Sequence, residues 1–302
     1  MRIRATVAAV TGAVALSAFA GTAAHAAGND SAYRGEAVKI FQGAHAGAAK
    51  QGVKATGSDG DLTPLDASFS NFKIASSIKV GTTNHVATTV TYTLTHGADV
   101  DIQSDEFATG PFIYKGSYDD ADNALFGDEP ATCKVVTTTT ASCTGKIDIY
   151  PGDGFLFNSD AGSWKGAALA FDLDPVDPEN GDVAWADQGA LGKTSVLRNS
   201  KLTVNASPEP VKKGKTITVT GALTRANWED NKYHGYTKQS VQLQYRKKNS
   251  TTYTTLKTVT TDSKGNLKTT VKASADGYFR YKFAGTSTTP AVTATGDFVD
   301  VK

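Results

Sequence analysis

The residues between 172 and 182 form the densest group of oxygen ligands in the chain. The carboxylates and the amide in this stretch belong to Asp172, Asp174, Asp177, Glu179, Asn180 and Asp182. Calcium takes about six to eight oxygen ligands, and an acidic turn can supply them together with its backbone carbonyls. The calcium loop of an EF-hand is excluded, because the glycine that it needs at its sixth position is replaced by Asp177. Two interpretations stay open: a calcium site, or a solvated acidic loop between two strands.

Two further acidic runs lie outside this loop. Their members are Asp119, Asp120, Asp122, Asn123, Asp128 and Glu129 in one run, and Asp99, Asp101, Asp105 and Glu106 in the other. The loops of a β-sandwich gather at its two ends, so two of the three acidic groups can meet in one site. Solvated surface charge is the simpler interpretation of both runs.

Basic side chains alternate with apolar ones near the C-terminus. The outward positions of two predicted strands carry Lys268, Lys272, Arg280 and Lys282, and Tyr253 and Tyr278 are interleaved. Further basic residues nearby are Lys212, Lys213, Lys215 and Arg246 to Lys248. Such a surface can bind an anionic cell-wall polymer or acidic glycan through carboxylate or phosphate groups. The alternative is an ordinary lysine-rich exterior that keeps strand edges from pairing. We do not expect an exported chain to bind nucleic acid. Another protein is a further candidate partner.

The sequence offers little for catalysis, and we predict that the chain is not an enzyme. It contains no H-E-x-x-H pair, no G-x-S-x-G turn and no glycine-rich phosphate loop. His85 and His96 flank one predicted strand and could reach aspartates as a base or a metal site, but strand-end residues explain them as well. A hydrolase that uses two carboxylates is the least favoured alternative, because no cleft-forming insertion is evident in the sequence. Such an enzyme depends on the distance between its two carboxylates, which the sequence does not give.

Cys133 and Cys143 are the two cysteines of the chain. They flank the β-branched segment KVVTTTTAS, whose symmetry predicts a hairpin with the cysteines opposite each other. We therefore predict a disulfide, which fits an oxidising compartment. Closing so short a loop should stabilise the fold by roughly 2–3 kcal/mol.

Residues 1–26 have the pattern of a secretory signal peptide. Arg2 and Arg4 precede an apolar run, and Ala24-His25-Ala26 resembles a cleavage site. The apolar run is shorter than the ~20 residues that span a bilayer. We predict an extracellular protein with no membrane partner. Residues 27–66 are rich in Ala and Gly and predict a short helix over Tyr33–Lys50, capped by Ser31, followed by a linker.

From residue 67 onwards the pattern changes to strands. In HVATTVTYTLT the residues Val86, Val90 and Leu94 alternate with polar ones, and SWKGAALAFDL is a further strand with small residues at Gly166, Ala168 and Ala170. Residues 67–198 predict one β-sandwich. Residues 199–302 contain about seven short alternating strands separated by turns, as in GYFRYKF, and this spacing is typical of an immunoglobulin-like sandwich.

Charge separates the two predicted domains. Residues 67–198 hold 8 Lys and Arg against 18 Asp and Glu, a net of −10. Residues 201–302 hold 17 against 7, a net of +10. Opposite net charges of this size make contact between the acidic and the basic domain physically plausible.

Three segments resemble a family of uncharacterised secreted actinomycete proteins with tandem immunoglobulin-like domains. These segments are LTVNASPEPVKKGKTITVTGALTRANW, the final 43 residues from TTDSKGNL to FVDVK, and GSWKGAALAFD. The resemblance is specific over 199–302, looser over 67–198, and does not include 27–65. It implies export and an all-β fold of two tandem immunoglobulin-like sandwiches after the signal peptide and the Ala/Gly-rich segment. Some members are named calcium-binding proteins, but the family carries no established activity to transfer.

Overall fold

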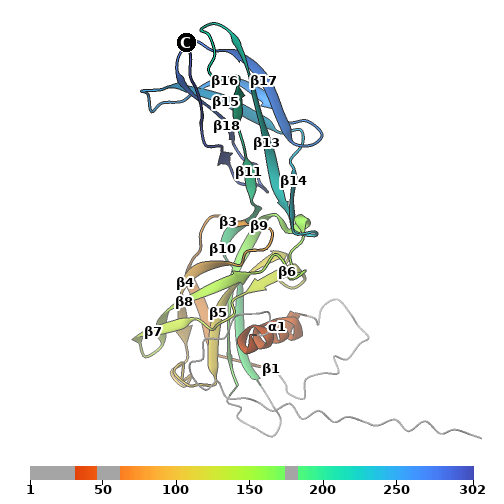
Figure 1. Cartoon of the computed structure of the whole chain (residues 1–302). Helices are drawn as coiled ribbons and strands as arrows, with labels where there is room; N and C mark the ends of the chain where they lie inside the picture. Colours follow the sequence, from red (N-terminus) through yellow and green to blue (C-terminus); the bar gives the residue numbers. More distant parts are fainter. Residues whose placement is uncertain (1–30, 46–61, 174–182) are drawn as a thin grey trace, which may run out of the picture.

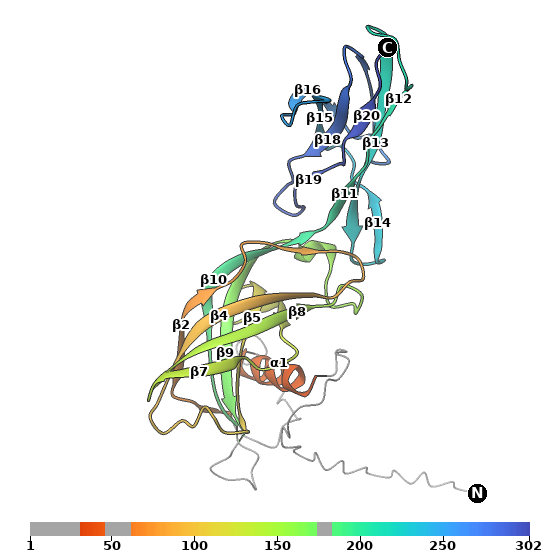
Figure 2. The same ribbon diagram turned by 60° about the vertical axis from the view of Figure 1, so that its left-hand side comes forward.

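The computed structural model describes residues 31–45, 62–173 and 183–302. These residues form an all-β chain of two immunoglobulin-like sandwiches placed end to end, with one helix against the first sandwich (Figures 1 and 2). The predicted signal peptide lies outside the described residues. Among the described helices, none is long and apolar enough to cross a membrane.

Two sheets form the first sandwich. The larger sheet has the order β1-β10-β9-β5-β6, with β3 also on β10, and its strands are Leu62–Pro64, Val183–Arg198, Gly162–Asp172, Phe107–Gly116, Ala121–Phe126 and Ile78–Val80. The smaller sheet has the order β2-β4-β8-β7, and its strands are Ala67–Lys73, Val86–His96, Thr140–Ile149 and Thr132–Thr137. The inward side chains of both sheets, among them Val90, Ile147 and Trp164, form one buried cluster.

Strand β9 is buried on both of its faces. Ala168 and Ala170 point toward the smaller sheet, while Leu169 and Phe171 point to the opposite side. The small residues leave room for the facing sheet: a Cβ on Gly166 would lie 2.5 Å from the ring of Phe72. This arrangement explains why the segment reads as a nearly continuous apolar run.

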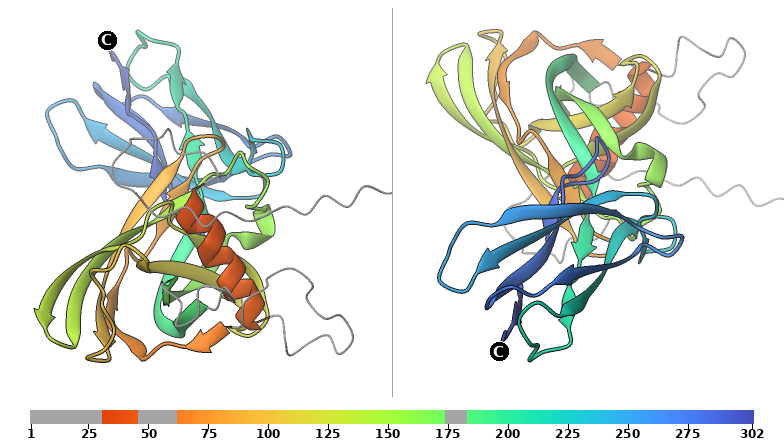
Figure 3. Two further views of the ribbon diagram at one scale, coloured as in Figure 1. Left: turned by 90° about the horizontal axis from the view of Figure 1, so that it is seen from below. Right: turned by 90° about the horizontal axis from the view of Figure 1, so that it is seen from above.

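Helix α1 (Ala32–His45) covers the outer face of the larger sheet (Figure 3, left). Its buried side chains Tyr33, Ala37, Ile40 and Phe41 pack on that sheet in a second apolar cluster. Ser31 caps the helix, because its Oγ accepts a hydrogen bond of 3.2 Å from the Arg34 amide. The helix is described as far as His45, and the remainder of the prediction, up to Lys50, lies outside the described residues. Helix α1 packs on the larger sheet and β1 pairs with β10, so both belong to the first sandwich.

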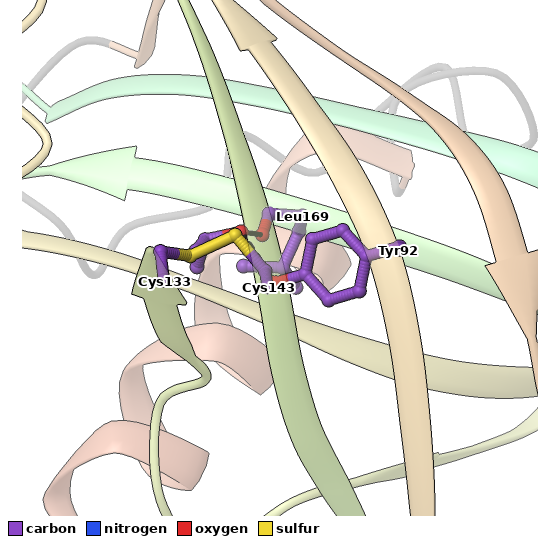
Figure 4. Close-up of a disulfide and its surroundings, with 5 residues drawn as sticks. Tyr92, Cys133, Cys143 and Leu169 are labelled. Carbon is purple, nitrogen blue, oxygen red and sulfur yellow. Dashed lines mark hydrogen bonds between the residues drawn. A yellow bond between two sulfur atoms is a disulfide. The ribbon is translucent and has the colours of Figure 1, made fainter. Parts of the chain in front are cut away.

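The disulfide joins Cys133 on β7 to Cys143 on β8 (Figure 4). The two residues are direct partners in the antiparallel pair, and their Cα atoms are 4.0 Å apart. Cys143 is fully buried beside Tyr92, whose hydroxyl is 2.9 Å from the hydroxyl of Thr109. Thr109 in turn donates to the Leu169 carbonyl of the larger sheet at 2.8 Å. The predicted bridge therefore reinforces the edge of the smaller sheet next to the core.

Two sheets also form the second sandwich. One has the order β11-β13-β12, with β14 and β17 also on β13, and its strands are Ser200–Leu202, Thr216–Asn227, Asn205–Ser207, Lys232–Gly235 and Asn266–Lys272. The other has the order β16-β15-β18-β19, with β20 also on β18, and its strands are Thr254–Thr260, Ser240–Lys247, Gly277–Phe283, Val292–Thr293 and Asp297–Val299. Their buried residues, such as Val219, Leu243 and Tyr281, fill the space between them.

The junction between the sandwiches is short and well packed. Strand β10 ends at Arg198 and β11 begins at Ser200. Trp228 of the second sandwich is buried in the core cluster of the first, and its Nε1 donates to the Gly81 carbonyl at 2.9 Å. Asn158 accepts from the Trp228 amide at 3.1 Å. Among the described residues no ion pair joins the two sandwiches, so their contact depends on Trp228 and hydrogen bonds rather than on their opposite net charges.

Candidate functional site

The outer face of one sheet of the second sandwich carries two arginines among three aromatic rings. Leu243 on β15 and Tyr281 on β18 point into the core, so the residues between the inward positions of these strands point outward. The outward set consists of Arg246, Arg280, Tyr253, Tyr278 and Phe298, which we call the arginine–aromatic face.

The guanidinium groups of this face stack on its rings. Arg280 lies 3.6 Å from the ring centroid of Tyr253, and Arg246 lies 3.9 Å from that of Tyr278. The rings of Tyr278 and Phe298 are 5.1 Å apart, on directly paired residues of β18 and β20. Glycine at position 296 lets Tyr253 lie close to the sheet, because a Cβ there would be 2.4 Å from the tyrosine hydroxyl. Stacking of this kind fixes a guanidinium without using all of its N–H groups.

Hydrogen bonds complete the positioning of both arginines. Arg280 Nε donates to Gln244 Oε1 at 2.9 Å, and Arg246 donates to the Ser250 carbonyl at 2.8 Å. Among the described residues no carboxylate lies within ion-pair distance of either guanidinium. The face therefore presents two oriented cations whose charge is not balanced by a neighbouring acid.

The four basic residues that the sequence singled out do not form one surface. Arg280 and Lys282 are on β18 and belong to the sheet of the arginine–aromatic face. Lys268 and Lys272 are on β17, which pairs with β13 in the other sheet. Since the core lies between the sheets, the two pairs point away from opposite sides of the sandwich. The structure adds Phe298 to the face, which the sequence analysis had missed although GDFVD alternates like a strand.

The acidic loop is described only at its first ligand. Asp172 is the last residue of β9 and pairs with Phe107 and Ala184. Asp174, Asp177, Glu179, Asn180 and Asp182 lie outside the described residues, so the calcium site stays a prediction. The run from Asp99 to Glu106 shares this end of the sandwich, because the Leu173 amide donates to the Glu106 carbonyl at 3.1 Å.

The predicted histidines lie in different surroundings. His96 is buried, and its Nδ1 is 2.9 Å from the Gly97 carbonyl oxygen. His85 Nε2 lies 2.7 Å from Asp148 Oδ1, close to Asp128 of the first acidic run outside the loop. Asp148 was not a candidate in the sequence analysis. Its place between Ile147 and Ile149 follows the alternation of the strand, so the sequence does not distinguish it from an ordinary outward carboxylate.

Comparison with known proteins finds solved structures that are similar to the chain but does not assign it to a family. No protein-family profile and no curated protein matches the chain. Three solved structures are similar over most of it: the titin I-band fragment I67–I69 (12% identity, TM-score 0.28), the mouse nectin-like molecule 4 ectodomain (11%, 0.22) and the Escherichia coli adhesin FdeC (12%, 0.28). The alignments cover 78%, 79% and 78% of this chain, and 66%, 65% and 65% of those chains. The chain thus spans just under two thirds of their length. Because these TM-scores are low, we infer the fold from the strand pairing of the chain itself.

Proposed function

We propose that the protein is an exported, non-catalytic binding module whose arginine–aromatic face holds an anionic cell-wall polymer or acidic glycan. The observation that carries this proposal is the pair of stacked guanidinium groups, Arg246 and Arg280, with no carboxylate partner among the described residues. A guanidinium offers a planar fork of N–H donors, which matches the two oxygens of a carboxylate or a phosphate.

The neighbours of the two arginines favour a polymer over a small anion. Lys282 is exposed two residues after Arg280 on the same strand. Lys248 Nζ lies 5.5 Å from the Phe298 ring and 3.6 Å from Asp276 Oδ2, with which it forms an ion pair. Charges spaced along a sheet can contact successive anionic groups of one chain. The rings of Tyr253 and Tyr278 add apolar surface on which a sugar can lie. The net charge of +10 over residues 201–302 attracts such a polymer from a distance.

The composition of the face also favours binding over catalysis. Its five members are two arginines, two tyrosines and one phenylalanine. General acid–base catalysis depends most often on an imidazole or a carboxylate, and the face contains neither. A carboxylate-dependent hydrolase is therefore not what this face supports.

The proposal is tested by titrating the chain from residue 27 with purified polyanions. We would measure affinity for a carboxylate polymer, polygalacturonate, and for a phosphate polymer, teichoic acid, at low and at high salt. The double variant Arg246→Ala/Arg280→Ala should bind at least ~10-fold more weakly, because the charge-assisted hydrogen bonds are lost. The matched control is Lys268→Ala/Lys272→Ala, which removes the same charge from the opposite sheet.

The control should change affinity by no more than about 2-fold, and wild-type binding should weaken as salt screens the charges. Equal weakening in both double variants would mean that the polymer binds a diffuse basic surface and not the arginine–aromatic face. The absence of binding to either polymer by the wild type would refute the proposal.

A further inference from the structure

A second group of ionisable side chains lies in the first sandwich, far from the arginine–aromatic face in sequence. It consists of His85, Asp128 and Asp148, which we call the histidine–aspartate centre. One potential ligand atom from each residue lies within 4.8 Å of the other two. His85 precedes β4, Asp128 follows β6, and Asp148 is on β8. Three separate segments therefore converge at this point.

The members of the centre contact one another directly. His85 Nε2 is 2.7 Å from Asp148 Oδ1, and Asp148 Oδ2 accepts a 3.0 Å hydrogen bond from the Asp128 amide. The carboxylate of Asp128 is ion-paired with Arg34 of α1 at 2.8 Å. These contacts leave little freedom to either carboxylate.

A shell of neighbours orients the centre from outside. The Tyr150 hydroxyl donates to the carboxylate of Asp128, and the Tyr150 ring stacks on His85 with centroids 4.3 Å apart. Ser31 donates from its hydroxyl to the Asp128 carbonyl. Metal ligands in proteins are commonly held by outer hydrogen bonds of this kind.

The charges of the centre do not balance. Asp128 and Asp148 are each only 6% exposed, and Arg34 is the one cation paired with them among the described residues. With a neutral imidazole the group carries a net charge of −1. Two buried carboxylates close together repel each other, so a bound cation would stabilise this arrangement.

A cavity of about 500 Å³ gives access to the centre. Its lining includes all three residues of the centre as well as Glu129 and Lys146. The His85 side chain is 42% exposed, so one side of the centre faces solvent. An ion can enter from this side and keep a water molecule as a further ligand.

We propose that His85, Asp128 and Asp148 bind one Zn²⁺ ion, independently of polymer binding by the second sandwich. Zinc accepts imidazole nitrogen and carboxylate oxygen in the same site, whereas calcium prefers oxygen ligands alone. Tetrahedral zinc with bonds of about 2.0–2.2 Å places its ligand atoms roughly 3.4 Å apart. The contact between His85 Nε2 and Asp148 Oδ1 must therefore open by less than about 1 Å. The fourth position would be taken by water from the cavity.

The test is calorimetric titration of the untagged, metal-stripped chain from residue 27 with ZnCl₂ at pH 7.5. We expect saturable binding of one ion. His85→Ala removes a half-exposed ligand and should weaken binding at least ~100-fold while circular dichroism shows an intact fold. The matched control is His234→Ala, which removes the exposed histidine that contacts Asp230 and should leave the affinity unchanged.

A second variant tests whether zinc binding depends on the whole centre or on His85 alone. Tyr150→Phe removes only an outer hydrogen bond and should weaken zinc binding about 10-fold. Zinc should also raise the melting temperature of the wild type, but not of His85→Ala. Lack of saturable zinc binding by the wild type would overturn the proposal. So would an unchanged affinity in His85→Ala, or loss of binding in His234→Ala.

Discussion

The arginine–aromatic face and the histidine–aspartate centre use charged side chains in opposite ways. On the face, Arg246 and Arg280 are held by rings and hydrogen bonds, with no acid beside them among the described residues. In the centre, Asp128 and Asp148 are buried, and each is tied to a neighbour of opposite or adjustable charge. Charge on the face is held by aromatic rings and faces outward, whereas charge in the centre joins α1, β8 and the start of β4.

This difference predicts two separate consequences of mutation. Breaking a buried charge pair leaves its partner unpaired in a poorly solvated place, which lowers stability strongly. Removing a surface charge changes the free energy of unfolding by less than about 0.5 kcal/mol. Substitutions in the centre should therefore be read out by stability, and substitutions on the face by affinity.

The largest expected effect is that of Asp128→Ala. This substitution leaves the Arg34 guanidinium without its carboxylate and should lower the free energy of unfolding by about 3–5 kcal/mol. Urea denaturation followed by circular dichroism measures the change. Lys282→Ala removes an exposed charge from β18 and is the control, which should stay within about 0.5 kcal/mol of the wild type. Similar losses in the two variants would remove the distinction between the regions.

Removal of the disulfide should have an intermediate effect. Cys133→Ser/Cys143→Ser opens a loop with a sequence separation of 10 residues and should lower the free energy of unfolding by about 2–3 kcal/mol. Because the bridge is on the smaller sheet of the first sandwich, polymer affinity at a temperature where the variant is folded should not change. A parallel loss of affinity would show that the face depends on this sheet.

A smaller effect should follow from Arg280→Lys, measured as affinity for the polyanion. Lysine keeps the charge but loses the planar stacking on Tyr253 and the bond from Nε to Gln244. We expect binding about 3- to 10-fold weaker, with the free energy of unfolding lowered by no more than about 1 kcal/mol. Lys282→Arg is the reciprocal control and should not weaken binding. Unchanged affinity in Arg280→Lys would mean that only net charge matters.

The smallest effect concerns Asp262 in the turn before β17. Backbone hydrogen bonds from Asn266 and Lys264 hold the pKa of this carboxyl below its usual range. A carboxyl with a lowered folded-state pKa adds stability above its unfolded-state pKa of about 3.9, and this stability is lost as pH falls through the folded-state pKa. The stability difference between wild type and Asp262→Asn should therefore shrink below about pH 4. Carboxyl NMR gives the pKa directly, and an ordinary or raised value would contradict the assignment.

Alternation along strands was enough to predict the class of fold. In β15 and β18 every second residue enters the core, and GYFRYKF shows this pattern directly in the sequence. The disulfide followed from the symmetry of the hairpin between its cysteines. Strand β9 was predicted as a strand, but the burial of its second face was not. Leu169 and Phe171 on that face pack on a helix more than 100 residues earlier in the chain.

Sites proved harder to predict than strands, since a site depends on which outward faces meet. Sequence spacing could not reveal that Lys268 and Arg280 are on different sheets, because both simply alternate with core residues. Asp148 was overlooked because a single carboxylate in a strand has no local motif. Only the tertiary structure brings it to His85, 63 residues away in sequence.

The junction at Asn199 also determines how the two sandwiches are oriented relative to each other. One residue separates β10 from β11, and Trp228 is anchored in the neighbouring core, so a hinge between the sandwiches would have to withdraw a buried indole. A polymer bound to the face of the second sandwich would therefore be held in a fixed orientation relative to the first sandwich.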